Sequence, residues 1–201
     1  FRKRVATQIP TLRDFLDWAT HIDGLRAVFL DVKIPGNLEE LAAPFARVVN
    51  AILEDFRPRF ACIFMTPHKN IMRAMKPHVV SRTFSWDTEV APGVVLDSDK
   101  YSGVRAALAE KNGVASIGRP ALTWGAWRLY QEIIEADVAR LSEHHREAKA
   151  EDRAPDCDCL IAWTINARNE QRRLLHLGVH GILTDDPRPL ARLANREGLV
   201  K

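Results

Sequence analysis

Apolar residues along this chain fall into short β-branched runs that alternate with longer segments of helical spacing. An apolar run of about four to eight residues between turn signals is typical of a buried strand. Helices are indicated where apolar positions recur about every three to four residues. The pattern predicts six strands, two of them weak, at 25–34, 59–66, 78–85, 114–118, 158–166 and 179–187.

Helical patterns fill most of the intervals between these runs. Pro10 and Thr11 are helix-start signals, and Gly178 is a helix stop. We expect helices at 9–22, 38–56, 68–76, 102–113, 124–153, 167–178 and 188–198. The stretch 86–103 is rich in Pro, Gly and Asp, which predicts a loop that would serve as a lid or a substrate wall.

Alternating strands and helices are typical of βα units around a parallel sheet. The chain has six such units, whereas a closed eight-stranded barrel needs about 250 residues. The predicted fold is therefore α/β, a (β/α)8 TIM-type barrel that is incomplete by about two strands and about 50 residues. We expect residues 1–201 to form a single domain.

Two opposite charges interrupt the first predicted strand, in the stretch "LRAVFLDVKI" at 25–34. Side chains alternate across a strand, so Asp31 and Lys33 point to the same side. Burying either charge without a partner would cost several kcal/mol. The two residues must therefore pair, meet water at the end of the strand, or bind a group such as a metal and an anion.

Composition narrows the function classes. The chain has 46% hydrophobic and 27% charged residues, which is the composition of a globular protein. Its net charge is +3, but basic and acidic residues are interspersed, which argues against nucleic-acid binding. No apolar run approaches the roughly 18 residues of a transmembrane helix. Three cysteines, without zinc-ligand spacing, favour a reducing compartment, so we expect an intracellular protein, cytoplasmic or organellar.

Four stretches together resemble the glycerophosphodiester phosphodiesterase family of phospholipase-C-like phosphodiesterase barrels. They follow the order of the family's motifs: "IPTLRDFL" (9–16), "LDVKI" (30–34), "AWTIN" (162–166) and "GVHGILTDDP" (178–187). The resemblance implies barrel strands three to eight, the C-terminal three-quarters of such a domain. A missing N-terminal segment or a partner chain is then expected to complete the barrel. The implied activity is metal-dependent hydrolysis of glycerophosphodiesters or phospholipid head groups, so peripheral membrane contact is compatible with it.

The resemblance also implies roles for individual residues. Asp31 would bind one divalent cation, Mg²⁺ or Ca²⁺, and Lys33 would be a catalytic residue that faces the phosphate. Trp163 and Asn166 would contact the substrate. Trp163 is also compatible with core packing, and Asn166 with capping of the next helix. For Asp185 a turn and helix cap is the favoured interpretation.

Several motifs of that family are absent from this sequence. They are the His-Arg-Gly motif, the Glu-x-Asp metal pair and the His-Asp motif that supply acid, base and further ligands. Neither His21 nor His180 lies where the family places its catalytic histidines, so the chain alone is expected to be inactive. The alternative function is that of a catalytically degenerate member, a structural or interaction subunit of a larger assembly.

Overall fold

The computed structural model describes residues 9–80, 83–89, 101–118 and 126–199. Within these residues, six strands pair in parallel and in their order along the chain. They are β1 (Ala27–Asp31), β2 (Ala61–Thr66), β3 (Phe84–Glu89), β4 (Val114–Gly118), β5 (Cys159–Trp163) and β6 (Gly181–Ile182). Each strand is joined to the next through at least one helix, as parallel pairing requires.

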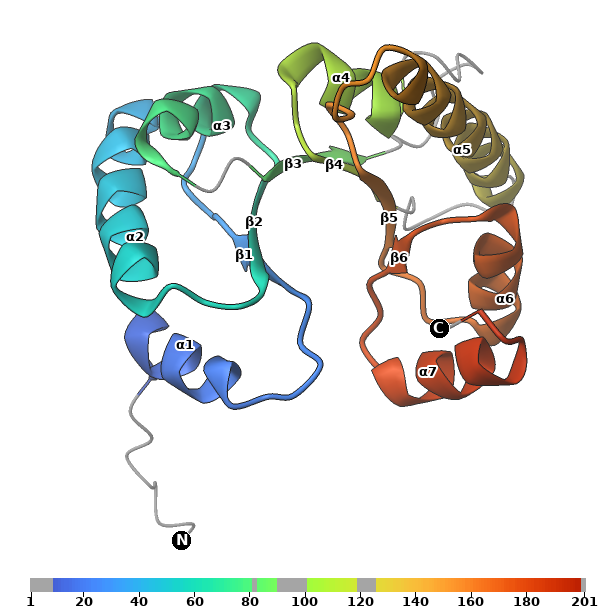
Figure 1. The fold of residues 1–201 in the computed structure, drawn as a ribbon, viewed down its shortest axis with the longest axis horizontal. Helices are drawn as coiled ribbons and strands as arrows, with labels where there is room; N and C mark the ends of the chain where they lie inside the picture. The colour runs from blue at the N-terminus through green and yellow to red at the C-terminus, as the bar shows by residue number, and fades with distance from the viewer. Residues whose placement is uncertain (1–8, 81–82, 90–100, 119–125, 200–201) are drawn as a thin grey trace, which may run out of the picture.

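The sheet curls, and the helices cover its convex side (Figure 1). These helices are α1 (Leu12–Thr20), α2 (Ala42–Phe56), α3 (Lys69–Met75), α4 (Gly103–Glu110), α5 (Ala126–Ala150), α6 (Arg168–Leu177) and α7 (Pro187–Arg196). Two 3-10 turns accompany them, η1 (Glu39–Leu41) and η2 (Lys76–His78). The edges of β1 and β6 lie at the two ends of this arc, which confirms the predicted α/β fold with part of a TIM-type barrel wall.

Apolar side chains cover both faces of the sheet. On the concave face, a small cluster contains Ile63, Val114 and Ile161. The residues that alternate with them, such as Ile117 and Leu160, pack with the helices on the convex face. A strand buried on both faces must be apolar at successive positions, and this is why the sequence shows continuous apolar runs.

The third strand differs most from its predicted position at 78–85. The chain forms η2 up to His78, and the N–H of Val80 donates to Oδ1 of Asn50 on α2 at 2.7 Å, so this stretch pairs with a helix. β3 begins only at Phe84, and its last four residues fall in the predicted loop 86–103. Pairing of Ser85–Glu89 with β4 overrides the local polar signals there. Residues 90–100 of that predicted loop lie outside the described residues.

Other boundaries shift by a few residues. β1 ends at Asp31, so Lys33 lies beyond the strand that was predicted to continue to 34. β6 is only two residues long. A bend at Asp185 then leads to Asp186, which caps α7 by accepting a hydrogen bond from the N–H of Arg188. The Asp-Asp-Pro stretch is thus a turn and a cap, as expected, with Asp186 as the capping residue.

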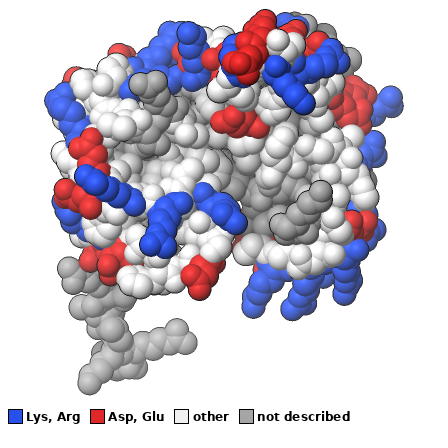
Figure 2. Space-filling model, viewed as in Figure 1, with Lys and Arg blue, Asp and Glu red and all other residues white. Residues whose placement is uncertain are grey.

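Exposed arginines form a stripe on α7. Arg188, Arg192 and Arg196 recur every fourth residue and are exposed, while Leu193 and Ala194 are buried. Figure 2 shows Lys and Arg side chains projecting from the lower right edge of the molecule, where α7 lies in Figure 1. Spacing of this kind places all three charges on one side of an amphipathic helix. None of the helices in the described ranges has both the length and the hydropathy for crossing a bilayer.

A nearly buried carboxylate joins α3 to α4. Glu110 accepts hydrogen bonds from Nε and Nη2 of Arg73 at 2.9 and 2.7 Å, and Nζ of Lys69 lies 2.6 Å from it. The Glu110 side chain is only 8% exposed. The hydrogen bonds from Arg73 are the main reason why the pKa of Glu110 falls to about 2.

Replacing Glu110 by Gln is expected to lower the free energy of unfolding by about 2 kcal/mol near pH 7. The pKa of Glu110 is about 2 in the folded protein and about 4.5 in the unfolded chain. The folded state therefore holds the charged form more strongly, and the full stabilisation is present above pH 4.5. This stabilisation is lost as the pH falls from 4.5 towards about 2, and the variant should then approach the wild type. Urea denaturation of both proteins between pH 7 and about pH 2 measures the difference in the free energy of unfolding. The exposed Glu40→Gln is the control, and a difference that does not change with pH would contradict the prediction.

Candidate active site at the barrel mouth

The carboxyl ends of all six strands meet at one rim, because the strands are parallel. This rim is where TIM-barrel enzymes place their active sites. Asp31 and Trp163 are the last residues of β1 and β5, and Met65 is the penultimate residue of β2. The fold therefore brings three side chains of different character to the end of the barrel that is suited to chemistry.

A cavity of about 390 Å³ opens at this rim. Its lining residues are Asp31, Lys33, Met65, Pro67, Trp163, Thr164 and Leu183. Three of the four predicted site residues thus lie on one cavity, although β1 and β5 are separated by three strands in the sheet. Curling of the sheet is what brings them together.

Asp31 and Lys33 form an ion pair. Nζ of Lys33 lies 2.9 Å from Oδ1 of Asp31, and the side chains are 69% and 43% exposed. The pair therefore both neutralises itself and meets water. An exposed pair of this kind stabilises a fold by at most about 1 kcal/mol. Both charges remain accessible to a ligand that enters the cavity.

Trp163 is half-buried and forms one wall of the cavity. Its indole Nε1–H donates to Oγ of Ser116 on β4 at 2.5 Å. The peptide bond between Trp163 and Thr164 is cis. Trp163 is thus a cavity wall rather than a fully enclosed core residue.

Asn166 is not among the residues that line this cavity. Its Nδ2 donates to Oδ2 of Asp185 at 2.7 Å, and its Oδ1 accepts from the N–H of Asp185 at 3.0 Å and from Oγ1 of Thr184 at 2.9 Å. The N-cap of α6 is Ala167, which makes no side-chain capping bond, so the capping interpretation of Asn166 is wrong. Asn166 instead holds Asp185 in place after β6.

Sequence reasoning missed two residues on β4. Ser116 and Gly118 both contact Trp163, but the stretch "VASIG" was predicted only as a short strand. Period-two alternation in that strand was the one available signal, since it places both residues on the face opposite to Ile117.

None of the seven histidines, all of which lie in described ranges, lines the cavity. His21 lies at the exposed end of α1, and Nδ1 of His180 accepts from the N–H of Leu160 near the start of β5, away from the mouth. His68 follows β2 at the rim, but its ring lies against Gly36, where a Cβ would come within 3.1 Å of Nδ1. Neither His21 nor His180 occupies the cavity, as the sequence indicated.

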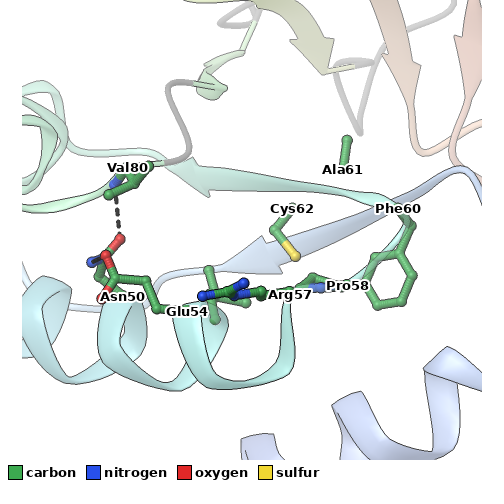
Figure 3. A pocket seen from close by; sticks show the side chains of 9 residues that line it. Asn50, Glu54, Arg57, Pro58, Phe60, Ala61, Cys62 and Val80 are labelled. Atoms are coloured by element: carbon green, nitrogen blue, oxygen red, sulfur yellow. Dashed lines mark hydrogen bonds between the residues drawn. The ribbon is translucent and has the colours of Figure 1, made fainter.

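Other cavities lie on the helical side of the sheet. One of about 550 Å³ lies between α2 and β2 (Figure 3). The amide of Asn50 in it is already bonded to Val80, and burial raises the pKa of the Cys62 thiol, which lowers its reactivity. The mouth cavity is therefore the better candidate, because an acid, a base and an aromatic wall meet there.

Known proteins are similar to this chain in sequence and in fold. Glycerophosphodiester phosphodiesterase GDPD4 of Arabidopsis thaliana is 24% identical over 182 residues, which are 90% of this chain and 45% of the relative. A solved structure from Silicibacter pomeroyi, described as a glycerophosphoryl diester phosphodiesterase, matches with a TM-score of 0.66 and 18% identity, covering 94% of this chain and 57% of that one. The chain resembles the glycerophosphodiester phosphodiesterase family in sequence and has its fold.

A third match is the phosphodiesterase of Oleispira antarctica, solved in complex with the product sn-glycerol-3-phosphate. Its TM-score is 0.50 and its identity 14%, and the match covers 84% of this chain and 55% of that one. This chain spans about half the length of the curated glycerophosphodiester phosphodiesterase that it matches. No family model matches the sequence.

A divalent cation would need more ligands than the described part of the cavity supplies. Asp31 is the sole carboxylate among its lining residues, and the described residues contain no group of three His, Cys, Asp or Glu side chains arranged for a metal. Mg²⁺ and Ca²⁺ are bound by six or more oxygens, of which waters and substrate often supply several. Asp31 fits such a site as one oxygen ligand, and the described residues alone do not complete it.

Proposed function

We propose that this chain contributes to a barrel that hydrolyses glycerophosphodiesters or the head groups of phospholipids. The observation that carries this proposal is the meeting of Asp31, Lys33 and Trp163 on one cavity at the carboxyl ends of the strands. Similarity to glycerophosphodiester phosphodiesterases in sequence and fold supports the reaction class.

In this proposal, Lys33 binds a non-bridging oxygen of the phosphate. An ammonium group is a compact positive charge that suits a phosphoryl oxygen, and the Lys33 side chain lines the cavity and is 69% exposed. Asp31 holds Lys33 at the mouth before a ligand arrives. Trp163 offers a wall to the glycerol part. The product sn-glycerol-3-phosphate, with which the Oleispira antarctica phosphodiesterase was solved, is small enough for a cavity of about 390 Å³.

We propose that Asn166 acts through Asp185 rather than by entering the cavity. Its amide holds the Asp185 carboxylate and the N–H of Asp185 at the carboxyl end of the sheet. Asp185 is exposed there. A substrate hydroxyl that extends beyond Trp163 would therefore form a hydrogen bond with Asn166 or Asp185.

Hydrolysis also requires groups that this cavity lacks among the described residues. No histidine lines it, and proton transfer to the leaving oxygen needs an acid within hydrogen-bond reach. The edge of β1 offers a place for further barrel strands, from the same protein or from a partner chain. Beside it lies a groove of about 530 Å³ with mainly apolar lining, and two of its lining residues, Phe45 and Val48, are 39% and 62% exposed.

We further propose that Asp31 binds one divalent cation, Mg²⁺ or Ca²⁺. Titration calorimetry on the longest natural form of the protein, with either ion and in the presence of sn-glycerol-3-phosphate, is expected to show uptake. Asp31→Asn should bind the ion at least about tenfold more weakly, which corresponds to a loss of about 1.4 kcal/mol or more. Asp17→Asn, an exposed aspartate on α1, is the matched control and should bind as the wild type does.

Two outcomes would contradict this part of the proposal. Equal binding by Asp31→Asn and the wild type would leave Asp31 as the partner of Lys33 alone. No uptake by the longest natural form of the protein would argue against a cation at the mouth.

A further inference from the structure

Trp163 lies directly against the concave face of β4. In the sheet register Gly118 is the partner of Trp163, and Ser116 is the partner of Ile161, two residues earlier. The indole Nε1–H reaches back to Oγ of Ser116 at 2.5 Å. The ring therefore extends along β4 across two inward positions.

The six-membered part of the indole occupies the space above Gly118. A Cβ at this position would lie 2.5 Å from Cη2, 2.6 Å from Cζ2 and 2.9 Å from Cζ3 of Trp163. These distances are shorter than any normal carbon contact, so any other residue at 118 would displace the ring.

The polar end of the indole is also fixed, by its hydrogen bond to Ser116. Ser116 is 1% exposed, so its hydroxyl provides a hydrogen bond in a place that water scarcely reaches. Loss of this acceptor would leave the indole N–H without its partner at a cost of about 1 to 3 kcal/mol, unless the ring turned towards solvent. One hydrogen bond and one absent side chain thus determine where the ring lies.

We propose that Ser116 and Gly118 are positioning residues that hold the Trp163 indole as a fixed wall of the mouth cavity, and so set the space between this wall and Lys33. The effect of this space on the binding of a phosphodiester rests on the proposed function, whereas the placement of the ring does not. A ligand that binds between Lys33 and the indole would meet a preformed gap rather than a mobile side chain, which reduces the entropy lost on binding.

NMR spectroscopy of the uniformly ¹⁵N-labelled 201-residue chain tests the role of the Ser116 hydroxyl. The signal to follow is that of the indole N–H of Trp163. The chain has five tryptophans, and Trp163→Phe identifies the signal by removing it. Ser116→Ala is expected to shift this signal and to speed its hydrogen exchange about fivefold or more, since a loss of about 1 kcal/mol corresponds to that factor. Ser116→Thr, which keeps a hydroxyl, should restore the wild-type signal.

Ser85→Ala is the matched control for the hydroxyl. Ser85 is fully buried on the neighbouring strand β3, and its Oγ has no hydrogen-bond partner among the described residues. The same chemical change there should leave the indole signal of Trp163 where it is. An equal shift in both variants would mean that general loosening of the sheet moves the ring, and it would overturn the role of Ser116.

Gly118→Ala tests the other contact, with Gly181→Ala as its control. A Cβ at Gly181 would lie 2.4 Å from Cδ1 of Ile161, so it crowds the same strand β5 but touches no tryptophan. Only Gly118→Ala should move the Trp163 signal, and it should change the affinity for sn-glycerol-3-phosphate about fivefold or more. Far-ultraviolet circular dichroism confirms that each variant is folded.

The results separate the two proposals. If the indole signal responds to Ser116→Ala and Gly118→Ala but the longest natural form of the protein binds no sn-glycerol-3-phosphate, the positioning stands and the proposed function fails. If the wild type binds this ligand and neither variant changes the signal or the affinity, the positioning is wrong and the proposed function is untouched.

Discussion

Replacing Lys33 by Met is expected to lower kcat for glycerophosphodiester hydrolysis by about 10²- to 10³-fold in the protein with a complete barrel. Methionine keeps most of the length of the side chain but removes the charge that would face the developing negative charge on the phosphate. Loss of one such electrostatic contact in other enzymes costs about 10²- to 10³-fold in rate. The affinity for the product sn-glycerol-3-phosphate should fall less, by about tenfold, because the contact with Lys33 is expected to be stronger in the transition state than with a bound product.

Steady-state kinetics with a glycerophosphodiester, combined with product binding, measures both effects. Lys149→Met, an exposed lysine at the end of α5, is the matched control and should keep wild-type rates. Lys33→Arg should recover part of kcat, since the charge is retained while the geometry differs. A rate for Lys33→Met within twofold of the wild type would leave Lys33 as no more than the ion-pair partner of Asp31.

The largest expected effect on stability is that of Phe64→Ala, which should lower the free energy of unfolding by about 3 to 5 kcal/mol. Phe64 on β2 is 1% exposed, and its ring stacks on Phe84 of β3 with 5.3 Å between centroids. The variant loses the apolar surface of the ring, leaves a cavity under α2 and α3, and removes an aromatic pair worth about 0.5 to 1.5 kcal/mol. Folded proteins are stable by only about 5 to 15 kcal/mol, so much of the margin would be lost.

Chemical denaturation monitored by circular dichroism tests this prediction. Phe64→Leu keeps most of the volume and should cost less than about 1.5 kcal/mol. Phe45→Ala is the control on the surface of α2, where the side chain is 39% exposed, and it should cost clearly less than Phe64→Ala. A loss below about 1 kcal/mol for Phe64→Ala would show that this cluster contributes little to the fold.

Strand and helix types were predictable from the sequence wherever burial sets the pattern. The runs around Ile63 and Ile161 are apolar on both faces because helices cover one side of the sheet and a barrel interior the other. The predicted ends of strands were wrong where a single tertiary contact determines where the strand begins or ends. Val80 bonds to Asn50 on a helix instead of to a strand. Trp86 belongs to β3, although it is the first residue of the predicted loop 86–103. Local propensity contains no information about these partners.

The candidate site divides in the same way. Asp31 and Lys33 were recognisable because alternation places both charges on one side of a strand, and the family motifs singled out Trp163 and Asn166. The bond from Asn166 to Asp185 was not foreseen, since it links the ends of β5 and β6 across 19 residues of sequence. For Ser116 and Gly118, alternation along the strand could indicate only a shared face. Their contact with the large ring of Trp163 is visible only in the structure.

Sequence by itself determined the repeated βα units, the parallel sheet and the pair of charges at the end of β1, because burial periodicity and side-chain alternation are local properties of the chain. Only the tertiary structure decided that Trp163 of β5 shares a cavity with that pair, and that Ser116 and Gly118 hold the indole in place. These contacts depend on the curl of the sheet and on its register, which arise when all six strands pack together.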